Sequence, residues 1–304
     1  MTEKFSPIAL FCYNRSDKLE RVINNLLENK ESKESILYIF CDGPKTSEDE
    51  KRVEAVHKVI DNVQGFKKIL IDKKSSNAGL ANSIIGGVNS VLEKHETVIV
   101  LEDDLLTSPY FLTYMNEGLT LYKNESKVAS VNGYVYDIKS TLPETFFVKG
   151  ASCWGWGTWR RAWQHFNPDT EGLIQELKKK GLEEAFNRFY PNREVSRMLR
   201  EQKEGKIDSW ALRWLASTFL KDMFTLYPSR SLVKNIGFDG SGRHGDVMID
   251  EVKFSQTPIN VFPVKIEESE EVKEAFRKYF YEFYANYGKK RSIIRSISKW
   301  FRGK

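Results

Sequence analysis

The sequence predicts an α/β fold in which a mainly parallel sheet is flanked by helices. Two observations carry this prediction. Short apolar runs alternate with helical patterns through about the first 140 residues, which is typical of parallel strands joined by helical crossovers. The run from Val98 to Leu101 is apolar and rich in β-branched residues, as a strand buried on both faces requires. After residue 140 the alternation stops, so we expect a second half of α+β type and a C-terminal helical tail.

Each element of the first half follows from a local pattern. Asp17 with Glu20, and Ser47 with Glu50, have the spacing of capping boxes that begin helices. The predicted strands are 7–13, 36–41, 68–72, 98–101 and 128–132, and the predicted helices are 17–29, 47–60, 80–92 and 108–122.

The second half is predicted with less regularity. We expect short strands at 146–150, 226–228 and 232–235, and helices at 171–180, 182–190, 194–205, 211–220 and 268–287. The boundaries then fall at 1–140 for the alternating α/β half, 141–265 for the second half and 266–304 for the tail.

Composition narrows the class of protein. The 304 residues are 40% hydrophobic and 29% charged, which is enough for a large core. A net charge of +5 is too balanced to indicate nucleic acid as a partner. The three cysteines lack metal-type spacing, and the chain has neither a signal-peptide pattern nor an apolar run near twenty residues. We therefore expect a cytoplasmic protein that does not span a membrane.

Three carboxylates, Glu102, Asp103 and Asp104, end the apolar strand. No basic residue follows within a dozen positions, and strand alternation predicts Glu102 and Asp104 on one side and Asp103 on the other. Ligands of open α/β sheets bind beyond the carboxyl ends of the strands. Mg²⁺ or Mn²⁺, completed by water and substrate phosphates, would neutralise these acids there. The alternative is that Asp103 and Asp104 are loop acids ahead of a helix beginning near Ser108.

Polar residues also follow the other predicted strands. Arg15 follows the first, Asp42 the second, and Asn77 the third. If the strands are parallel, these residues and the three acids share one edge, where a base, a ribose and a diphosphate could bind. Alternatively, Asp42 belongs to a simple turn and Arg15 is a solvated charge. Neither a GxGxxG nor a Walker A pattern is present, which disfavours dinucleotide and P-loop chemistry.

Tryptophans gather between residues 154 and 163. Trp154, Trp156 and Trp159 are interleaved with Gly155 and Gly157, a pattern from which we expect no ordinary strand or helix start. The flat faces of indole rings pack well on sugar rings. The three tryptophans are therefore candidate contacts for a sugar-containing second substrate, the acceptor. The alternative is that they are core residues between two subdomains.

Two further residues are candidates in the second half. Asp208 precedes an apolar helix and is either its N-cap, a catalytic residue, or both. His244 belongs to a glycine-rich loop, 235–246, of the kind that closes over phosphates, and is either a phosphate or metal contact or incidental.

The last sixteen residues, 289–304, carry only basic charges, interleaved with apolar residues at helical spacing. Such a helix can lie on an anionic membrane surface, which would make the protein peripheral on the inner face of the cell membrane. Docking on the parent domain or on a partner is the alternative.

Taken together, residues 7–246 resemble the GT-A fold nucleotide-sugar glycosyltransferases, in particular the N-acetylglucosaminyltransferase I group and its bacterial relatives. Leu-Glu-Asp-Asp-Leu, 101–105, resembles that group's variant of the Asp-x-Asp motif. The resemblance implies that Asp104 is the direct Mn²⁺ ligand and that Glu102 and Asp103 lie near the ribose and phosphate. Arg15 and Asp42 match positions that contact the nucleotide.

In the second half, Gly-Trp-Gly-Thr-Trp, 155–159, resembles the segment between donor and acceptor, and 240–244 resembles the late loop over the diphosphate. Asp208 falls where the family places its catalytic base. The chain differs from the animal enzymes in lacking an amino-terminal anchor and stem, which disfavours an N-glycan acceptor. The resemblance implies a cytosolic bacterial role in building surface polysaccharide or lipid-linked glycan.

The chemistry that follows is an inverting displacement. A divalent cation on Asp104 would neutralise the leaving nucleoside diphosphate, and Asp208 would accept the proton of the acceptor hydroxyl. A UDP-sugar is the expected donor. A metal-dependent nucleotidyltransferase and a non-catalytic glycan-binding or assembly protein are the alternatives.

Overall fold

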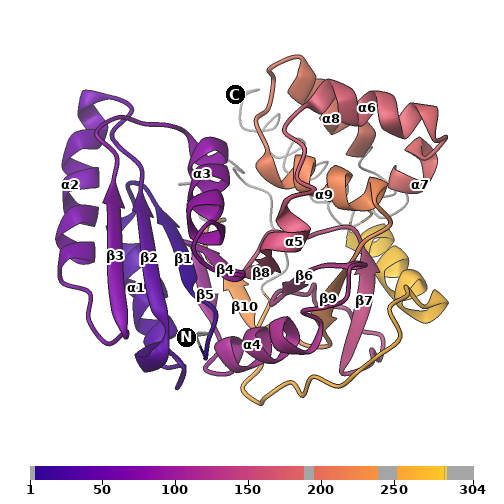
Figure 1. The fold of residues 1–304 in the computed structure, drawn as a ribbon, viewed down its shortest axis with the longest axis horizontal. Helices are drawn as coiled ribbons and strands as arrows, with labels where there is room; N and C mark the ends of the chain where they lie inside the picture. The colour runs from indigo at the N-terminus through magenta and orange to yellow at the C-terminus, as the bar shows by residue number, and fades with distance from the viewer. Residues whose placement is uncertain (1–3, 188–194, 239–251, 284, 286–304) are drawn as a thin grey trace, which may run out of the picture.

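The computed structural model describes residues 4–187, 195–238, 252–283 and 285. Its main feature is a sheet of eight strands in the order β3-β2-β1-β4-β8-β6-β9-β7 (Figure 1). The strands are β1 (Ile8–Cys12), β2 (Ile36–Cys41), β3 (Lys68–Lys73), β4 (Thr97–Glu102), β6 (Val128–Asn132), β7 (Thr145–Lys149), β8 (Trp156–Trp159) and β9 (Phe224–Pro228). All neighbours pair in parallel except β8, which opposes β4 and β6, and β7, which opposes β9. The predicted α/β class is confirmed.

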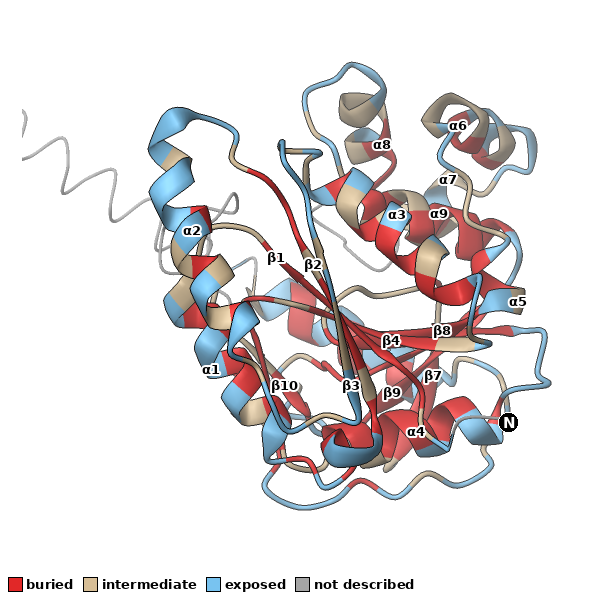
Figure 2. Cartoon of the chain, turned by 60° about the vertical axis from the view of Figure 1, so that its left-hand side comes forward, coloured by how far each residue is buried: buried red, intermediate tan, exposed pale blue. Residues whose placement is uncertain are grey.

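Helices cover both faces of this sheet (Figures 1 and 2). The helices of the first half are α1 (Ser16–Leu27), α2 (Ser47–Asp61), α3 (Leu80–Leu92) and α4 (Phe111–Leu121). Those of the second half are α5 (Arg160–Trp163), α6 (Thr170–Lys179), α7 (Glu183–Asn187), α8 (Val195–Lys203) and α9 (Trp210–Leu220). In Figure 2, α1 and α2 lie on one side of β1 and β2, while α3 and α9 lie on the other. The central strands β1 and β4 are almost entirely buried between them.

The capping-box predictions for the first two helices were wrong. The N-cap residues are Arg15 and Thr46, and neither side chain makes a capping hydrogen bond. Each N-cap lies ahead of the residue predicted to be the cap, so Asp17 and Glu50 lie in the first turn, where a carboxylate still interacts favourably with the helix dipole.

A second, two-stranded sheet joins β5 (Leu105–Thr107) to β10 (Val233–Asn235) in antiparallel register. The pattern around 105–107 did not predict a strand. Because β5 comes directly after the acidic residues, this pairing brings the chain near residue 235 to the end of β4.

The helical segment 270–283 confirms the predicted aromatic helix over the residues that the structure describes. Its Val272, Phe276 and Phe280 pack on Phe146 and Tyr227 of β7 and β9. None of the helices in the described ranges combines the length and the apolar character that a membrane crossing needs.

Candidate active site

Four loops meet where β1, β2, β3 and β4 end. The register places Cys12 beside Cys41, and Phe11 beside Glu102, so the ends of the parallel strands lie at one edge. Hydrogen bonds join the loops: the Tyr13 hydroxyl donates to Asp49 at 2.7 Å, and the Tyr13 amide donates to Asp103 Oδ2 at 3.4 Å. The predicted shared edge is confirmed.

Arg15 lies against the acidic residues. Its Nη2 is 2.9 Å from Asp104 Oδ2 and pairs even more closely with Asp103 Oδ1. The Asp103 side chain is only 4% exposed. We expected Asp103 to point away from Asp104, but the strand ends at Glu102 and the chain turns at the next two residues, so one guanidinium reaches both carboxylates. No basic residue follows these acids within a dozen positions, and the structure supplies the cation from Arg15, after β1.

The protonation of these acids is governed by burial. Burial, with the neighbouring charges of Asp104 and Asp103, raises the pKa of Glu102 to about 8. Burial also raises the pKa of Asp103 to about 6, against the opposing effect of Arg15. Arg15 remains charged, because the two aspartates raise its pKa more than burial lowers it. Near neutral pH, Glu102 is therefore largely protonated in the ligand-free protein, and Asp103 is largely ionised beside Arg15.

We expect the free energy of unfolding to fall as pH rises from 6 to 8, in the presence of a chelator. A carboxyl whose folded pKa of about 8 exceeds its unfolded pKa of about 4.5 contributes stability that is present at low pH and lost through the folded pKa. Glu102→Gln removes this titration, so the variant should gain about 1–2 kcal/mol relative to the wild type between pH 6 and pH 8. Urea unfolding at both pH values measures the difference. Parallel pH profiles for the two proteins would contradict the shifted pKa.

The acids fit a hard divalent cation by their chemistry. Mg²⁺ and Mn²⁺ prefer carboxylate oxygens, and Mg²⁺ typically takes one or two of them together with water and substrate phosphates. Asp104 is the most accessible of the paired acids, at 15% exposure, and could supply such an oxygen. Within the described part of the chain, no group of three or more His, Cys, Asp and Glu side chains is arranged to hold a metal by itself.

Asp42 and Asn77 join the loops after β2 and β3. The buried Asp42 carboxylate accepts hydrogen bonds from the amides of Gly43, Ala78 and Gly79 at 2.8–3.0 Å. The Asn77 amide group donates to the Gly43 carbonyl at 3.0 Å. Both side chains therefore shape the edge of the site, and a direct contact of either one with a nucleotide stays a prediction.

We expect Asp42→Asn to lower the free energy of unfolding by about 1–3 kcal/mol, because an amide cannot accept all three of these buried N–H groups. Asn77→Ala, which removes a single hydrogen bond from a partly exposed side chain, should cost about 0.5–1.5 kcal/mol. Urea unfolding compares the two. Equal losses, or a neutral Asp42→Asn, would show that the three contacts do not hold the loop.

The segment after β10 contacts Asp104 from the other side. The Ile236 amide donates to the Asp104 carbonyl at 2.8 Å, and a Cβ added at Gly237 would overlap the Asp104 carboxylate. Only a glycine allows the chain to approach this closely. No sequence pattern indicated this role, since Gly237 is one of four glycines in its loop.

The tryptophans separate into two kinds. The prediction that 154–159 excludes a strand was wrong, since Trp156–Trp159 form β8 in the middle of the sheet. Trp156 is fully buried against Trp163, Trp210 and Trp214, and Trp159 is 3% exposed with its Nε1 donating to the Leu119 carbonyl. In this structure neither ring has a face to offer a sugar, and both match the alternative of core packing.

Trp154 is different, because it lies just before β8 and is only partly buried. Its ring contacts those of Tyr134 and Phe238. Phe238 follows Gly237, which approaches the Asp104 carboxylate. Trp154 therefore lies on the side of the segment that contacts Asp104 and keeps its candidacy as a sugar contact.

Asp208 is exposed just ahead of α9. Its Oδ1 accepts a hydrogen bond from Arg213 Nη2 at 3.0 Å. The N-cap of α9 is Ser209, whose hydroxyl accepts from the Leu212 amide, so the capping alternative for Asp208 was wrong. Trp210 stacks on Trp156 at 5.3 Å, which ties the start of α9 to the start of β8. His244, its glycine-rich loop and the basic tail 289–304 lie outside the described residues.

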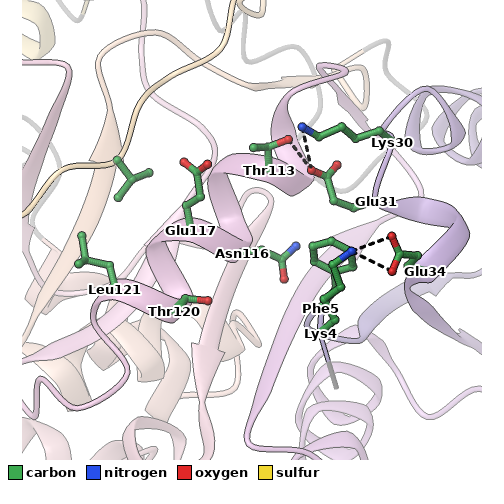
Figure 3. Close-up of a pocket in the computed structure, with 11 residues that line it drawn as sticks. Lys4, Phe5, Lys30, Glu31, Glu34, Thr113, Asn116, Glu117, Thr120 and Leu121 are labelled. Atoms are coloured by element: carbon green, nitrogen blue, oxygen red, sulfur yellow. Dashed lines mark hydrogen bonds and ion pairs between the residues drawn. The ribbon is translucent and has the colours of Figure 1, made fainter. Parts of the chain in front are cut away.

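A separate cavity of about 730 Å³ opens at the opposite end of the strands, where β1 and β2 begin (Figure 3). It lies between the segment before β1, the turn Ser32–Glu34 and α4. Its charges pair locally: Lys4 contacts both Glu34 oxygens at 3.0 Å, and the Thr113 hydroxyl donates to Glu31 at 2.6 Å. It contains none of the predicted site residues.

No family model matches the chain, and no curated protein matches it. Among solved structures, S. aureus TarS 1–349 aligns with 75% of this chain and 59% of its own, at 9% identity and a TM-score of 0.39. The mannosyltransferase PcManGT from Pyrobaculum calidifontis, solved with GDP-Man and Mn²⁺, aligns with 44% of this chain and 37% of its own, at 14% identity and a TM-score of 0.30. The chain thus spans well under two thirds of either protein, and the likeness is too weak to assign a substrate.

Proposed function

We propose that the chain is a GT-A type, metal-dependent inverting glycosyltransferase. It transfers a sugar from a nucleotide-sugar, a UDP-sugar in the first instance, to a hydroxyl of a glycan or lipid-linked acceptor in bacterial surface polysaccharide synthesis. One observation carries the proposal: three acids and one arginine converge at the carboxyl edge of a parallel sheet, where ligands of such folds bind.

The chain's own groups divide the work in this proposal. Asp104 would hold Mn²⁺ or Mg²⁺, and the cation would neutralise charge on the leaving diphosphate when bound. Glu102 and Asp103 would lie near the ribose and the phosphate. Arg15 adds a permanent positive charge at the same place, which suits a phosphate oxygen. Asp42 and Asn77 hold the loops that border the nucleotide.

The acceptor side is assigned to the second half of the chain. Trp154 offers a partly exposed ring on the side of the segment that contacts Asp104. Asp208 orients the acceptor hydroxyl and takes its proton as general base. His244 contacts the diphosphate and the basic tail holds the protein on the inner face of the membrane.

The proposal is tested by incubating the purified protein with a panel of nucleotide sugars and Mn²⁺, and by measuring release of the nucleoside diphosphate. Slow hydrolysis of one donor, abolished by a chelator, is expected. Release of pyrophosphate from a nucleoside triphosphate would instead favour a nucleotidyltransferase. Absence of both activities, and of nucleotide binding by calorimetry, would favour a glycan-binding or assembly protein.

Asp208→Asn should leave donor binding unchanged and reduce transfer about 10²- to 10⁴-fold, the usual contribution of a general base. Calorimetry with the nucleotide and single-turnover transfer with the identified acceptor separate the two effects. Asp137→Asn is a matched control, because Asp137 is another exposed aspartate paired with a nearby basic residue, Lys139. Transfer by Asp208→Asn at the control's rate would mean that another group accepts the proton.

A further inference from the structure

Arg15 is shared by two carboxylates that differ in how firmly they are held. Asp103 is buried and accepts from both Arg15 and the Tyr13 amide. Asp104 is more exposed, and its Oδ2 lies 2.9 Å from Arg15 Nη2. The backbone of Arg15 is fixed as the N-cap of α1, where its carbonyl accepts from the Leu19 amide at 3.0 Å. Movement of the guanidinium therefore requires only side-chain rotation.

A cation that binds Asp104 through this oxygen would compete with Arg15 for it. Oxygen ligands lie about 2.0–2.6 Å from Mg²⁺ or Ca²⁺, so a divalent ion of this kind on Asp104 would sit almost in contact with the guanidinium. Two cations this close in a partly buried site repel strongly. A diphosphate removes the conflict, because its oxygens can bind the metal ion and the guanidinium together.

We infer that Arg15 is a positioning residue that couples cation binding to binding of the donor diphosphate. Without the donor it holds Asp104 and disfavours the cation. With the donor it turns to the diphosphate while remaining paired with Asp103, and Asp104 becomes available. This inference rests on the proposed function and adds a coupling between two binding events. The cation binds weakly alone and tightly together with the nucleotide.

The test measures Mn²⁺ binding by electron paramagnetic resonance, with and without UDP, and with GDP in a parallel series. In the wild type, one of the nucleotides should tighten Mn²⁺ binding about 5- to 150-fold, the usual range of coupling between two sites. Arg15→Gln should bind Mn²⁺ alone about tenfold more tightly than the wild type and lose most of the coupling. Arg21→Gln, which removes an exposed charge from the same helix, should behave as the wild type.

A second variant guards against misfolding, because Arg15→Gln leaves the buried Asp103 without its cation. Arg15→Gln combined with Asp103→Asn removes both charges and should keep the tighter, nucleotide-independent Mn²⁺ binding. If both variants bind Mn²⁺ no more tightly than a wild type that shows coupling, the inference fails and the proposed function stands. If the wild type binds neither Mn²⁺ nor nucleotide, the proposed function fails with it.

Discussion

Asp104→Asn is expected to lower sugar transfer by about three orders of magnitude, since a metal ion that stabilises the departing diphosphate contributes several kcal/mol to the transition state. Asparagine keeps the size of the side chain but offers a neutral oxygen, which is a weak ligand for a hard cation. The fold should persist, because Arg15 retains Asp103. Initial rates over a titration of Mn²⁺ measure the effect.

A matched control for this variant is Asp61→Asn, which removes an exposed aspartate of α2 that pairs with Lys73. Its rate and Mn²⁺ dependence should be those of the wild type. If Asp104→Asn retains the Mn²⁺ dependence of the wild type at a rate within about tenfold, a loss of only 1.4 kcal/mol, the ligand is another residue.

The second large effect concerns stability: Trp156→Ala should lower the free energy of unfolding by about 3–5 kcal/mol. The ring is fully buried and packs on three other tryptophans from α5 and α9, so its removal leaves a cavity between the sheet and these helices. Urea unfolding measures the loss.

Trp154→Ala is the comparison for this prediction. Its ring is partly exposed and contacts those of Tyr134 and Phe238, so we expect a loss of about 1 kcal/mol, near the centre of the distribution for single substitutions. The rate of sugar transfer by this variant should fall further than its loss of stability alone would explain. A Trp156→Ala protein as stable as Trp154→Ala would contradict the core assignment.

The fold was predictable where a strand is a continuous apolar run. β1, β2 and β4 are buried by helices on both faces, so periodicity and length identified them. β8 was not predictable in this way, because Gly157 alternates with large rings. The structure gives the reason: a Cβ on Gly157 would lie 2.9 Å from Met115 Cε of α4 and 3.1 Å from the Val98 carbonyl oxygen of the neighbouring β4. The requirement for glycine at this position comes from tertiary packing, so no local sequence pattern reveals it.

The sequence predicted which edge of the sheet holds the candidate site. It did not predict which side chains there contact one another. Parallel strands place their ends together, which brought Arg15, Asp42 and the three acids to one region. Which side chains pair depends on turns of a few residues, such as the one at 103–104 that lets one arginine reach two acids. Asp42 shows the same limit: its carboxylate binds backbone amides from a loop more than thirty residues away.

The position of β8 also bears on how the chain becomes structured. This strand, which comes from the second half, lies between β4 and β6 of the first half and hydrogen-bonds to both. A nascent chain of 140 residues would thus hold β4 with one lateral partner missing and its amides open to pairing with other molecules. The acid-bearing strand completes its ladder only after residues 156–159 have been inserted, so the ladder around the candidate site depends on both halves of the chain.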